Sequence, residues 1–368
     1  MTPTDALVIG AGPAGLATSR ALSRRGVAHR VLERGDVAGY VWANLYDSLT
    51  LHTGRHMSHL PGRRFKAGTP LFPPRAAFVE YLQDYARAFG VPVETNVEVT
   101  RLARDGADWV ANTTGGDIRA RTVVLATGIV SNPRQPELPG AGAFRGTLLH
   151  SSSYRRPGPF AGQRVLVIGV GNSGGEIASE LARHGAHVTV AVRSGANVVP
   201  REIAGIPVQY LSFLLRKLPR AAQERVAGWV QRMGDRRRGP PVLPRPAYSA
   251  LDAIPLIGFN LVDAIREGLI AVRPGIAHIA ATGVQFTDGR EEPFDAIIAA
   301  TGFRAAVQPL GDLVQLDDRG FGHRTGRVVS TDQPNLFYVG HNYDSTGGLK
   351  NIARDAPLAA TRVIEALR

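Results

Sequence analysis

The stretch "DALVIGAGPAGLATSRALSRRG" (residues 5–26) decides the fold, because it contains a short apolar strand, a glycine-rich turn and an amphipathic helix in succession. In such a unit one glycine makes the tight turn, the next lets a pyrophosphate touch the backbone, and the third lets the helix pack on the strand. Gly10, Gly12 and Gly15 occupy these positions. The helix N-terminus would then favour the diphosphate charge. The following strand ends in Glu33, where a carboxylate can accept hydrogen bonds from ribose hydroxyls.

The same pattern returns at "QRVLVIGVGNSGGEIASELARHGAHVTVAVRS" (residues 163–194), with Gly169, Gly171 and Gly174. Here the second strand ends in Arg193 and Ser194 instead of an acid. An acid would repel a ribose 2′-phosphate, whereas a guanidinium can clamp it and a hydroxyl can add a donor. The sequence therefore predicts FAD in the first cradle and NADPH in the second. A solvated Arg at a strand end is the structural alternative for Arg193.

Two later strands end in Ala-Thr-Gly, one at residues 126–128 and one at residues 300–302. At each the missing glycine side chain would let a chain crossing or a cofactor come close. Together they predict an α/β fold with two dinucleotide-binding, Rossmann-like domains, the NADPH domain inserted into the FAD domain. We expect the FAD domain at residues 1–157 and 304–368. The NADPH domain is expected at 158–303, with a helical insertion at about 203–260.

Composition limits the possible functions. The chain has 368 residues, 44% of them hydrophobic, and a net charge of +12. Its basic residues are almost all Arg, a bias typical of GC-rich, bacterial genomes, and they are spread along the chain, so we expect no nucleic-acid partner. With no Cys, thiol redox chemistry and Cys-based metal sites are excluded, and we expect no metal. Without a spanning apolar run or a secretory leader, a cytoplasmic protein with no stable membrane insertion is expected.

Two segments are candidates for lining a substrate site. Residues 34–65 form a long loop, which in a compact domain usually has a function. The insertion carries the stretch "IAGIPVQYLSFLLRKLPRAAQERVAGWVQRM" (residues 203–233), helical, apolar on one side and Arg-rich on the other. It predicts a helical cover over a substrate channel, with a membrane-surface helix as the alternative. A helix is also expected at "GGLKNIARDA" (residues 347–356).

The chain resembles the flavin-containing monooxygenases (class B flavin monooxygenases), most closely the plant YUCCA type, the indole-3-pyruvate monooxygenases. The stretch "FRGTLLHSSSY" matches the family pattern Phe-x-Gly-x-x-x-His-x-x-x-Tyr/Phe with Phe144, Gly146, His150 and Tyr154. We expect it to be the link between the two domains. The stretches "VRSGANVVPREI" (192–203), "AVRPGI" (271–276) and "YDSLTLHTGRHMSHLP" (46–61) add to the likeness. In the last of these the chain has His52, as the YUCCA type does, where other monooxygenases usually carry Asn.

The resemblance implies that NADPH reduces FAD, that oxygen forms a flavin C4a-hydroperoxide, and that one oxygen atom enters a small organic substrate. His52 is the first candidate for a catalytic side chain near the reacting oxygens, and His150 the second. A packed loop histidine and a satisfied structural histidine are their alternatives. The expected cofactor contacts, with no metal among them, are Gly10, Gly12, Pro13, Ala14, Gly15, Glu33, Arg34, Trp42, His52, Val97, Ala126, Thr127, Gly128, Gly169, Gly171, Asn172, Ser173, Gly174, Arg193, Ser194, Arg201, Thr301, Gly302 and Leu349.

The reaction itself stays open at this point. Oxidative decarboxylation of an aryl 2-oxo acid such as indole-3-pyruvate needs a deprotonated, nucleophilic peroxide, whereas N- or S-oxygenation of a secondary metabolite uses the protonated, electrophilic form. A flavin NADPH oxidase or reductase shares both cradles but lacks the linker pattern, and a non-catalytic FAD protein is also allowed by the fold. A small-molecule substrate and O2 are the expected partners, and a homodimer is compatible with the sequence.

Overall fold

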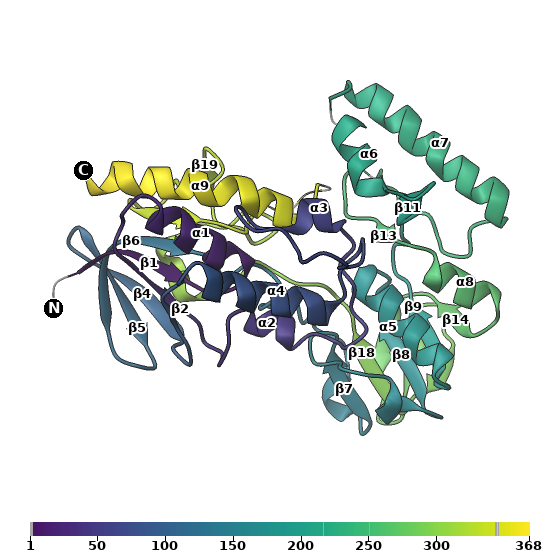
Figure 1. Cartoon of the computed structure of the whole chain (residues 1–368). Helices are drawn as coiled ribbons and strands as arrows, with labels where there is room; N and C mark the ends of the chain where they lie inside the picture. Colours follow the sequence, from purple (N-terminus) through teal and green to yellow (C-terminus); the bar gives the residue numbers. More distant parts are fainter. Residues whose placement is uncertain (1–2, 216, 250, 343, 345) are drawn as a thin grey trace. The chain divides into compact units, whose positions relative to one another are not determined.

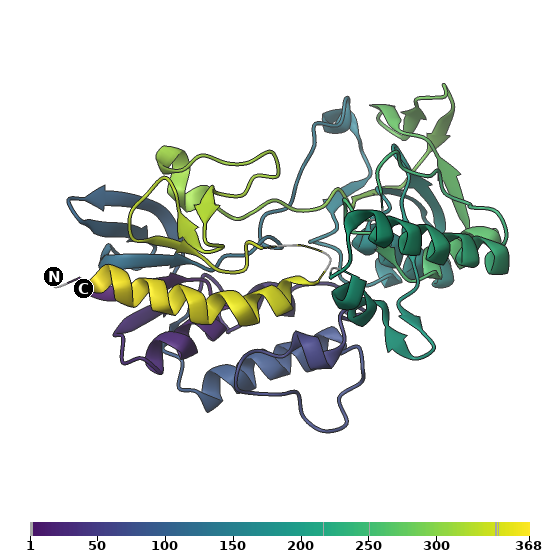
Figure 2. The same ribbon diagram turned by 90° about the horizontal axis from the view of Figure 1, so that it is seen from above.

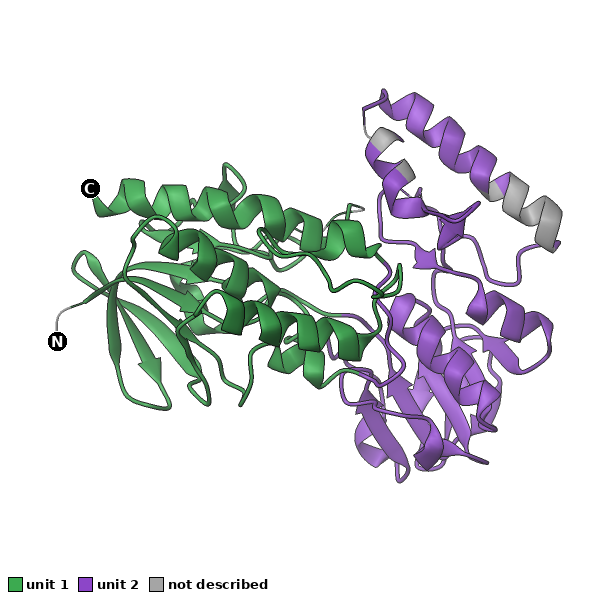
Figure 3. Cartoon of the chain, in the orientation of Figure 1, with its two compact units in different colours: residues 1–45, 53–132, 303–368 green, residues 46–52, 133–302 purple. Residues whose placement is uncertain are grey.

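The structure is a computed structural model that describes residues 3–215, 217–249, 251–342, 344 and 346–368, without the side chains of residues 211, 214, 231 and 233–238. The chain divides into two compact units, coloured green and purple in Figure 3. Unit 1 comprises residues 1–45, 53–132 and 303–368, and unit 2 comprises residues 46–52 and 133–302. Each unit is built around its own sheet, which is mixed in unit 1 and parallel in unit 2.

Unit 1 holds the larger sheet, whose described strands run in the order β19-β20-β21-β6-β1-β2-β3 with a β4–β5 hairpin beside β6 (Figure 1). The strand bounds are β1 (Thr4–Ile9), β2 (His29–Leu32), β3 (Val93–Glu94), β4 (Val99–Asp105), β5 (Asp108–Thr113), β6 (Ile118–Leu125), β19 (Arg324–Thr325), β20 (Val329–Ser330) and β21 (Leu336–Tyr338). The pairs from β3 to β21 through β1 are parallel. Strand β1 is central, and its residues Ala6, Leu7 and Val8 are fully buried, as both faces of a parallel strand usually are.

The helices of unit 1 cover this sheet. They are α1 (Pro13–Ser23), α2 (Tyr40–Ala43), α3 (Arg55–Ser58), α4 (Arg75–Ala88) and α9 (Gly348–Leu367), with a 3-10 segment at Gln308–Leu313. Figures 1 and 2 both show α9 alongside α1, and the two helices are in contact. Proline at the start of α1 suits the first turn, where its missing N–H has no partner to lose.

Unit 2 repeats the plan in a smaller sheet with the order β14-β9-β8-β18-β7, all parallel. Helices α5 and α8 pack together, and a β15-β16-β17 meander shares a hydrophobic cluster with β8 and β18. The strands are β7 (Thr147–His150), β8 (Arg164–Ile168), β9 (His187–Ala191), β10 (Val198–Val199), β11 (Glu202–Ile203), β12 (Ile206–Pro207), β13 (Leu256–Ile257), β14 (Ile270–Arg273), β15 (Ile276–Ile279), β16 (Gly283–Phe286), β17 (Glu291–Pro293) and β18 (Ala296–Ala299). The helices are α5 (Asn172–Arg183), α6 (Val208–Leu215), α7 (Arg220–Arg238) and α8 (Asn260–Arg266), with 3-10 turns at Ala141–Ala143 and Gly158–Phe160.

The main segment of unit 2 begins at Pro133, earlier in the chain than the expected boundary at residue 157. The stretch "FRGTLLHSSSY" is not a free link between domains. Its centre is strand β7, which pairs in parallel with β18 along Thr147–His150 and so belongs to the second sheet. Residues 46–52 also group with unit 2. The other boundary, at residues 302 and 303, lies within one residue of the expected one.

Two further expectations need correction in detail. The segment 34–65 is not a plain loop, since it contains the one-turn helices α2 and α3. In its described residues the insertion is helical in α6 and α7, it opens with the β11–β12 hairpin, and it carries β13 near its end. Part of its arginine-rich stretch lies outside the described side chains. Within the described part of the chain, no helix has the length and apolar character needed to cross a bilayer.

Candidate active site

The first cradle in unit 1 has the geometry that a dinucleotide needs. Gly10 has φ +100°, and a Cβ there would lie 2.9 Å from the Ala126 carbonyl oxygen. A Cβ on Gly15 would lie 1.8 Å from the Gly10 oxygen, so only glycine lets α1 approach β1 this closely. At Gly12, the N-cap of α1, a Cβ would meet nothing within 4 Å. The open space in front of the helix N-terminus is therefore where a pyrophosphate fits, and the residues present suit FAD.

Glu33 closes this cradle at the end of β2. Its side chain is buried, and the two carboxylate oxygens accept hydrogen bonds from the backbone N–H groups of Ala11 (2.9 Å) and Gly35 (3.1 Å). A carboxylate has about four lone-pair positions, so both oxygens can still accept from ribose hydroxyls. The backbone donors hold the acid beside the glycine turn, as the sequence pattern predicts.

The second cradle, in unit 2, reproduces these contacts at corresponding positions. Gly169 has φ +94°, and its Cβ would lie 2.7 Å from the Ala300 oxygen. A Cβ on Gly174 would lie 2.1 Å from the Gly169 oxygen, whereas one on Gly171 would meet nothing within 4 Å. The space in front of α5 therefore also suits a dinucleotide diphosphate.

The glycines of the two Ala-Thr-Gly strand ends were expected to admit either a chain crossing or a cofactor. A Cβ on Gly128 or Gly302 would meet no described atom within 4 Å, whereas Gly10 and Gly169 are in close approach to neighbouring backbone. The described chain therefore makes no crossing against Gly128 or Gly302, and the approach of a cofactor there stays a prediction. Their φ values of +66° and +87° are what favours glycine there.

The polar residues of the second cradle differ in exposure and in their contacts. Arg193 and Ser194 follow β9 and are exposed, so they are accessible to a phosphate. The Asn172 amide instead fastens β13: its Nδ2 donates to the Pro255 oxygen (3.2 Å), and its Oδ1 accepts from the Ile257 N–H (2.7 Å).

His52 belongs to a half-buried cluster in unit 2. Its Nε2 lies 3.6 Å from Oε1 of Glu176 on α5, and its buried Nδ1 has no hydrogen-bond partner among the described residues. The Tyr46 hydroxyl donates to the other oxygen of Glu176 at 2.5 Å. Arg201 donates from Nη2 to the Leu51 oxygen at 2.7 Å and so holds the segment that carries His52.

The charges in this cluster act on one another in opposite directions. Burial lowers the pKa of His52, while Glu176 raises it and Arg201 lowers it. Burial, followed by the charge of Glu176, raises the pKa of Tyr46. A hydrogen bond with the side chain of Ser173 acts in the opposite direction and lowers it. The imidazole is consequently neutral near pH 7, next to a carboxylate that would stabilise its protonated form.

His150 is held on both sides of its ring. Nδ1 accepts from the Ser152 N–H (3.1 Å) and lies 3.0 Å from the Ser152 hydroxyl, and Nε2 lies 3.1 Å from the Gly302 oxygen. Burial lowers its pKa, although the Gly302 contact raises it. This arrangement fits a histidine that ties β7 to the end of β18.

The remaining predicted residues lie around the cradles. In unit 1 Pro13 and Ala14 are buried in the first turn of α1, and Leu349 is buried at the start of α9. The side chain of Val97 is half-buried and that of Arg34 is exposed. The Trp42 ring packs edge-on against the Phe78 ring, with 4.7 Å between the ring centroids, and the Thr127 hydroxyl donates to the Ala306 oxygen at 2.5 Å. In unit 2 Thr301 donates to the Arg134 oxygen at 2.6 Å.

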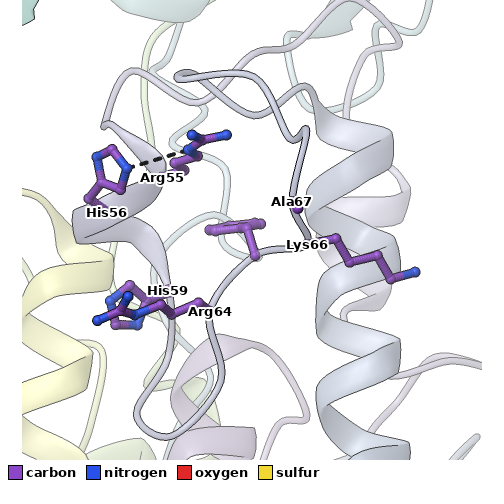
Figure 4. Close-up of a pocket in the computed structure, with 7 residues that line it drawn as sticks. Arg55, His56, His59, Arg64, Lys66 and Ala67 are labelled. Atoms are coloured by element: carbon purple, nitrogen blue, oxygen red, sulfur yellow. Dashed lines mark hydrogen bonds between the residues drawn. The ribbon is translucent and has the colours of Figure 1, made fainter.

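A separate cavity of about 340 Å³ lies in unit 1 beside α3 (Figure 4). It is lined mainly by basic side chains: Arg55, His56, His59, Arg64 and Lys66, together with Phe65 and Ala67. Several of these charges are already engaged. The Lys66 ammonium extends toward α4, where it pairs with Glu80 (2.5 Å) and Asp84 (2.9 Å), and Arg55 donates to the Thr69 oxygen.

Comparison with known proteins identifies this arrangement. The family model of the pyridine nucleotide-disulphide oxidoreductases matches residues 7–203. The "Indole-3-pyruvate monooxygenase YUCCA1" of Oryza sativa subsp. japonica is 38% identical over 315 residues, which cover 82% of this chain and 77% of that protein. The chain belongs to the class B flavin monooxygenases. The YUCCA4 protein of the same plant is 37% identical over 329 residues, covering 82% of this chain and 74% of its own length.

A solved structure agrees with this assignment. The "Flavin-containing monooxygenase from Stenotrophomonas maltophilia" has a TM-score of 0.79 and 27% identity, with 99% of each chain covered. This flavin monooxygenase is therefore an FAD- and NADPH-dependent oxidoreductase with an α/β fold of two dinucleotide-binding domains, as the sequence predicts.

Sequence reasoning missed Tyr46 and Glu176 in this monooxygenase. Their contact joins positions 130 residues apart, and neither residue belongs to a spacing with a known chemical meaning. The hints are that Tyr46 opens the quoted stretch 46–61 and that Glu176 follows the second glycine turn on α5.

Proposed function

We propose that this monooxygenase oxidatively decarboxylates an aryl 2-oxo acid such as indole-3-pyruvate. The 2-oxo acid, O2, NADPH and a proton would give the acid one carbon shorter, carbon dioxide, water and NADP⁺. The observation that carries the proposal is the half-buried His52 with an unengaged Nδ1, because attack on a ketone carbon needs an oxygen nucleophile that has lost its proton. The 38% identity with an enzyme named indole-3-pyruvate monooxygenase supports the substrate class.

The two cradles would divide the cofactors as the sequence indicates. Gly10, Gly12, Gly15 and Glu33 would hold FAD, with the remaining expected contacts of unit 1 around it. Gly169, Gly171 and Gly174 would hold the NADPH diphosphate, and the exposed Arg193 and Ser194 its 2′-phosphate. When bound and reduced, FAD supplies the electrons that activate O2, and the protein positions the reactants and excludes water.

The histidines would have unequal roles. Nδ1 of His52 would take a proton from the reacting oxygen, with the imidazole as general base. His150, with both ring nitrogens engaged, is assigned the structural alternative, in which it orders the end of β18. The insertion of α6 and α7 would cover the substrate, its aromatic residues facing the ring and an arginine its carboxylate.

The cellular setting is part of the proposal and rests on composition alone. We propose a cytoplasmic enzyme of bacterial source, although the curated relatives named above are plant proteins. We also propose a small-molecule substrate and O2 as the reactants, and a homodimer as the oligomeric state.

The test compares substrates. Purified holoenzyme is incubated with NADPH and either indole-3-pyruvate labelled at its carboxyl carbon, an amine or a thioether. Coupled NADPH oxidation with release of labelled carbon dioxide is the expected result. Clean oxidation of the amine or thioether without turnover of any aryl 2-oxo acid would instead assign N- or S-oxygenation. NADPH consumption that yields only hydrogen peroxide with all three would assign an oxidase.

The role of His52 has its own test. His52→Ala should leave flavin reduction by NADPH nearly unchanged, since the residue acts after oxygen enters, and should raise the hydrogen peroxide released per NADPH. An equal loss in the reduction rate would make His52 a packing or flavin-binding residue.

A further inference from the structure

The carboxylate of Glu176 joins three parts of unit 2. It projects from α5, receives the Tyr46 hydroxyl on Oε2 at 2.5 Å, and lies 3.6 Å from His52 Nε2 through Oε1. The two oxygens therefore serve different partners. The Tyr46 hydrogen bond fixes the carboxylate, and through it the carboxylate restrains the imidazole of His52.

The chemistry of the carboxylate determines which imidazole nitrogen is left available. An ionised carboxylate only accepts, so a neutral imidazole beside it places its proton on the nearer nitrogen, Nε2. The separation of 3.6 Å is an electrostatic contact longer than a hydrogen bond. Nδ1 then carries a lone pair, and it is the nitrogen that is buried without a partner among the described side chains.

We infer that Glu176 is the positioning residue of the oxygenation reaction: it holds His52 with the proton on Nε2, so that the lone pair of the unpartnered Nδ1 is the one left to accept a proton. In the step itself an O–H bond of the reacting oxygen breaks and an Nδ1–H bond forms. The electron pair stays on the oxygen, and the imidazolium is stabilised by the Glu176 carboxylate. The inference rests on the proposed function for the identity of the step and on the geometry for the role of Glu176.

The charges around the cluster agree with this role. Arg201 faces His52 and opposes its protonation, whereas Glu176 favours it. Glu202 acts on Arg201, and Glu180 acts on Tyr46. Glu176 is thus the acidic side chain that acts on His52 itself.

The same helix supplies a matched control. Glu180, one turn further along α5, accepts a hydrogen bond from the Tyr154 hydroxyl at 2.7 Å on its carboxylate. Among the described contacts no histidine meets that carboxylate, since His184 Nδ1 lies 2.8 Å from the backbone oxygen of Glu180 instead. Glu176→Gln removes the charge beside His52, and Glu180→Gln removes an equivalent charge from the neighbouring pair. A general loss of helix stability would affect both variants alike.

The first measurement uses protein without cofactor or substrate. The ¹⁵N-labelled imidazoles are followed by NMR against pH, with His52→Ala identifying the His52 signals. Glu176→Gln is expected to lower the His52 pKa and to shift the proton from Nε2 toward Nδ1, whereas Glu180→Gln leaves both unchanged. An unchanged His52 titration in Glu176→Gln, or an equal change in Glu180→Gln, would overturn the inference.

The second measurement uses the holoenzyme with its oxidisable substrate. Because general base catalysis contributes about 10²–10⁴-fold, Glu176→Gln should lower product formation about tenfold or more with flavin reduction unchanged, and Glu176→Asp should restore part of it. Product formation equal to wild type would also overturn the inference. If no aryl 2-oxo acid is oxidised but the NMR shifts appear, the substrate proposal fails and the positioning of His52 by Glu176 stands.

Discussion

Replacing Gly12 with Ala should separate cofactor binding from folding. Gly12 has φ −75° and ψ −171°, which alanine adopts without strain, and its Cβ would meet no protein atom within 4 Å. The unfolding free energy should therefore change by less than about 1 kcal/mol. The new methyl group would instead occupy the space assigned to the FAD pyrophosphate. Losing one charge-assisted hydrogen bond, about 1.5–3 kcal/mol, corresponds to about 10- to 150-fold weaker FAD binding.

The assay is urea unfolding of the cofactor-free protein together with a titration of FAD fluorescence. Gly171→Ala is the matched control: it should weaken NADPH binding and leave FAD binding unchanged, because the same open space lies in the other unit. In Gly15→Ala the new Cβ would lie 1.8 Å from a backbone oxygen, so this variant should have a lower unfolding free energy than Gly12→Ala. Wild-type FAD affinity in a folded Gly12→Ala protein would refute the assignment of the first cradle.

Three further changes test other parts of the structure. Arg193→Ala should reduce the preference for NADPH over NADH by about 1–3 kcal/mol, and an unchanged ratio of the two kcat/KM values would place the 2′-phosphate elsewhere. Asn172→Ala should lower the unfolding free energy by about 1–3 kcal/mol through the lost contacts to Pro255 and Ile257, whereas a wild-type urea midpoint would contradict this. Burial lowers the pKa of His341 to about 3 in the folded protein, whereas an unfolded histidine has a pKa of about 6.5. The unfolded chain therefore binds a proton more readily than the folded one, and the stability that is present above pH 6.5 is lost as the pH falls. The unfolding free energy measured in urea should fall by about 2 kcal/mol between pH 7 and pH 5, and it should fall by less in His341→Leu. An equal pH dependence in the two proteins would contradict this.

The paired fold was predictable from the sequence because its requirements are local. Each cradle needs a strand, three glycines and a helix in a stretch of about thirty residues. The close approaches at Gly15 and Gly174 come from this spacing alone. The expected boundary at residue 157 lies after β7, whereas β7 groups with unit 2 because it pairs with β18, a contact between distant parts of the chain that no local pattern encodes.

The same distinction separates the predicted from the missed site residues. His52 could be selected from the sequence because it lies in the stretch 46–61, where the family resemblance implies a loop that reaches the flavin. Its neighbours Glu176 and Tyr46 could not, since they meet it only through contacts between distant parts of the chain. Arg201 was expected as a cofactor contact, but not as a residue that holds the segment of His52. The structural role that we propose for His150 rests on the partners of its ring nitrogens, which no local sequence pattern shows.

The most direct test of the central assignment is the fate of oxygen. The yellow holoenzyme is given NADPH, ¹⁸O2 and indole-3-pyruvate, and the products are analysed by mass spectrometry while NADPH and hydrogen peroxide are counted. A flavin monooxygenase that acts on a 2-oxo acid should place one labelled oxygen atom in indole-3-acetate for each NADPH consumed. NADPH oxidation that leaves every organic product unlabelled, with all oxygen recovered as hydrogen peroxide, would contradict it.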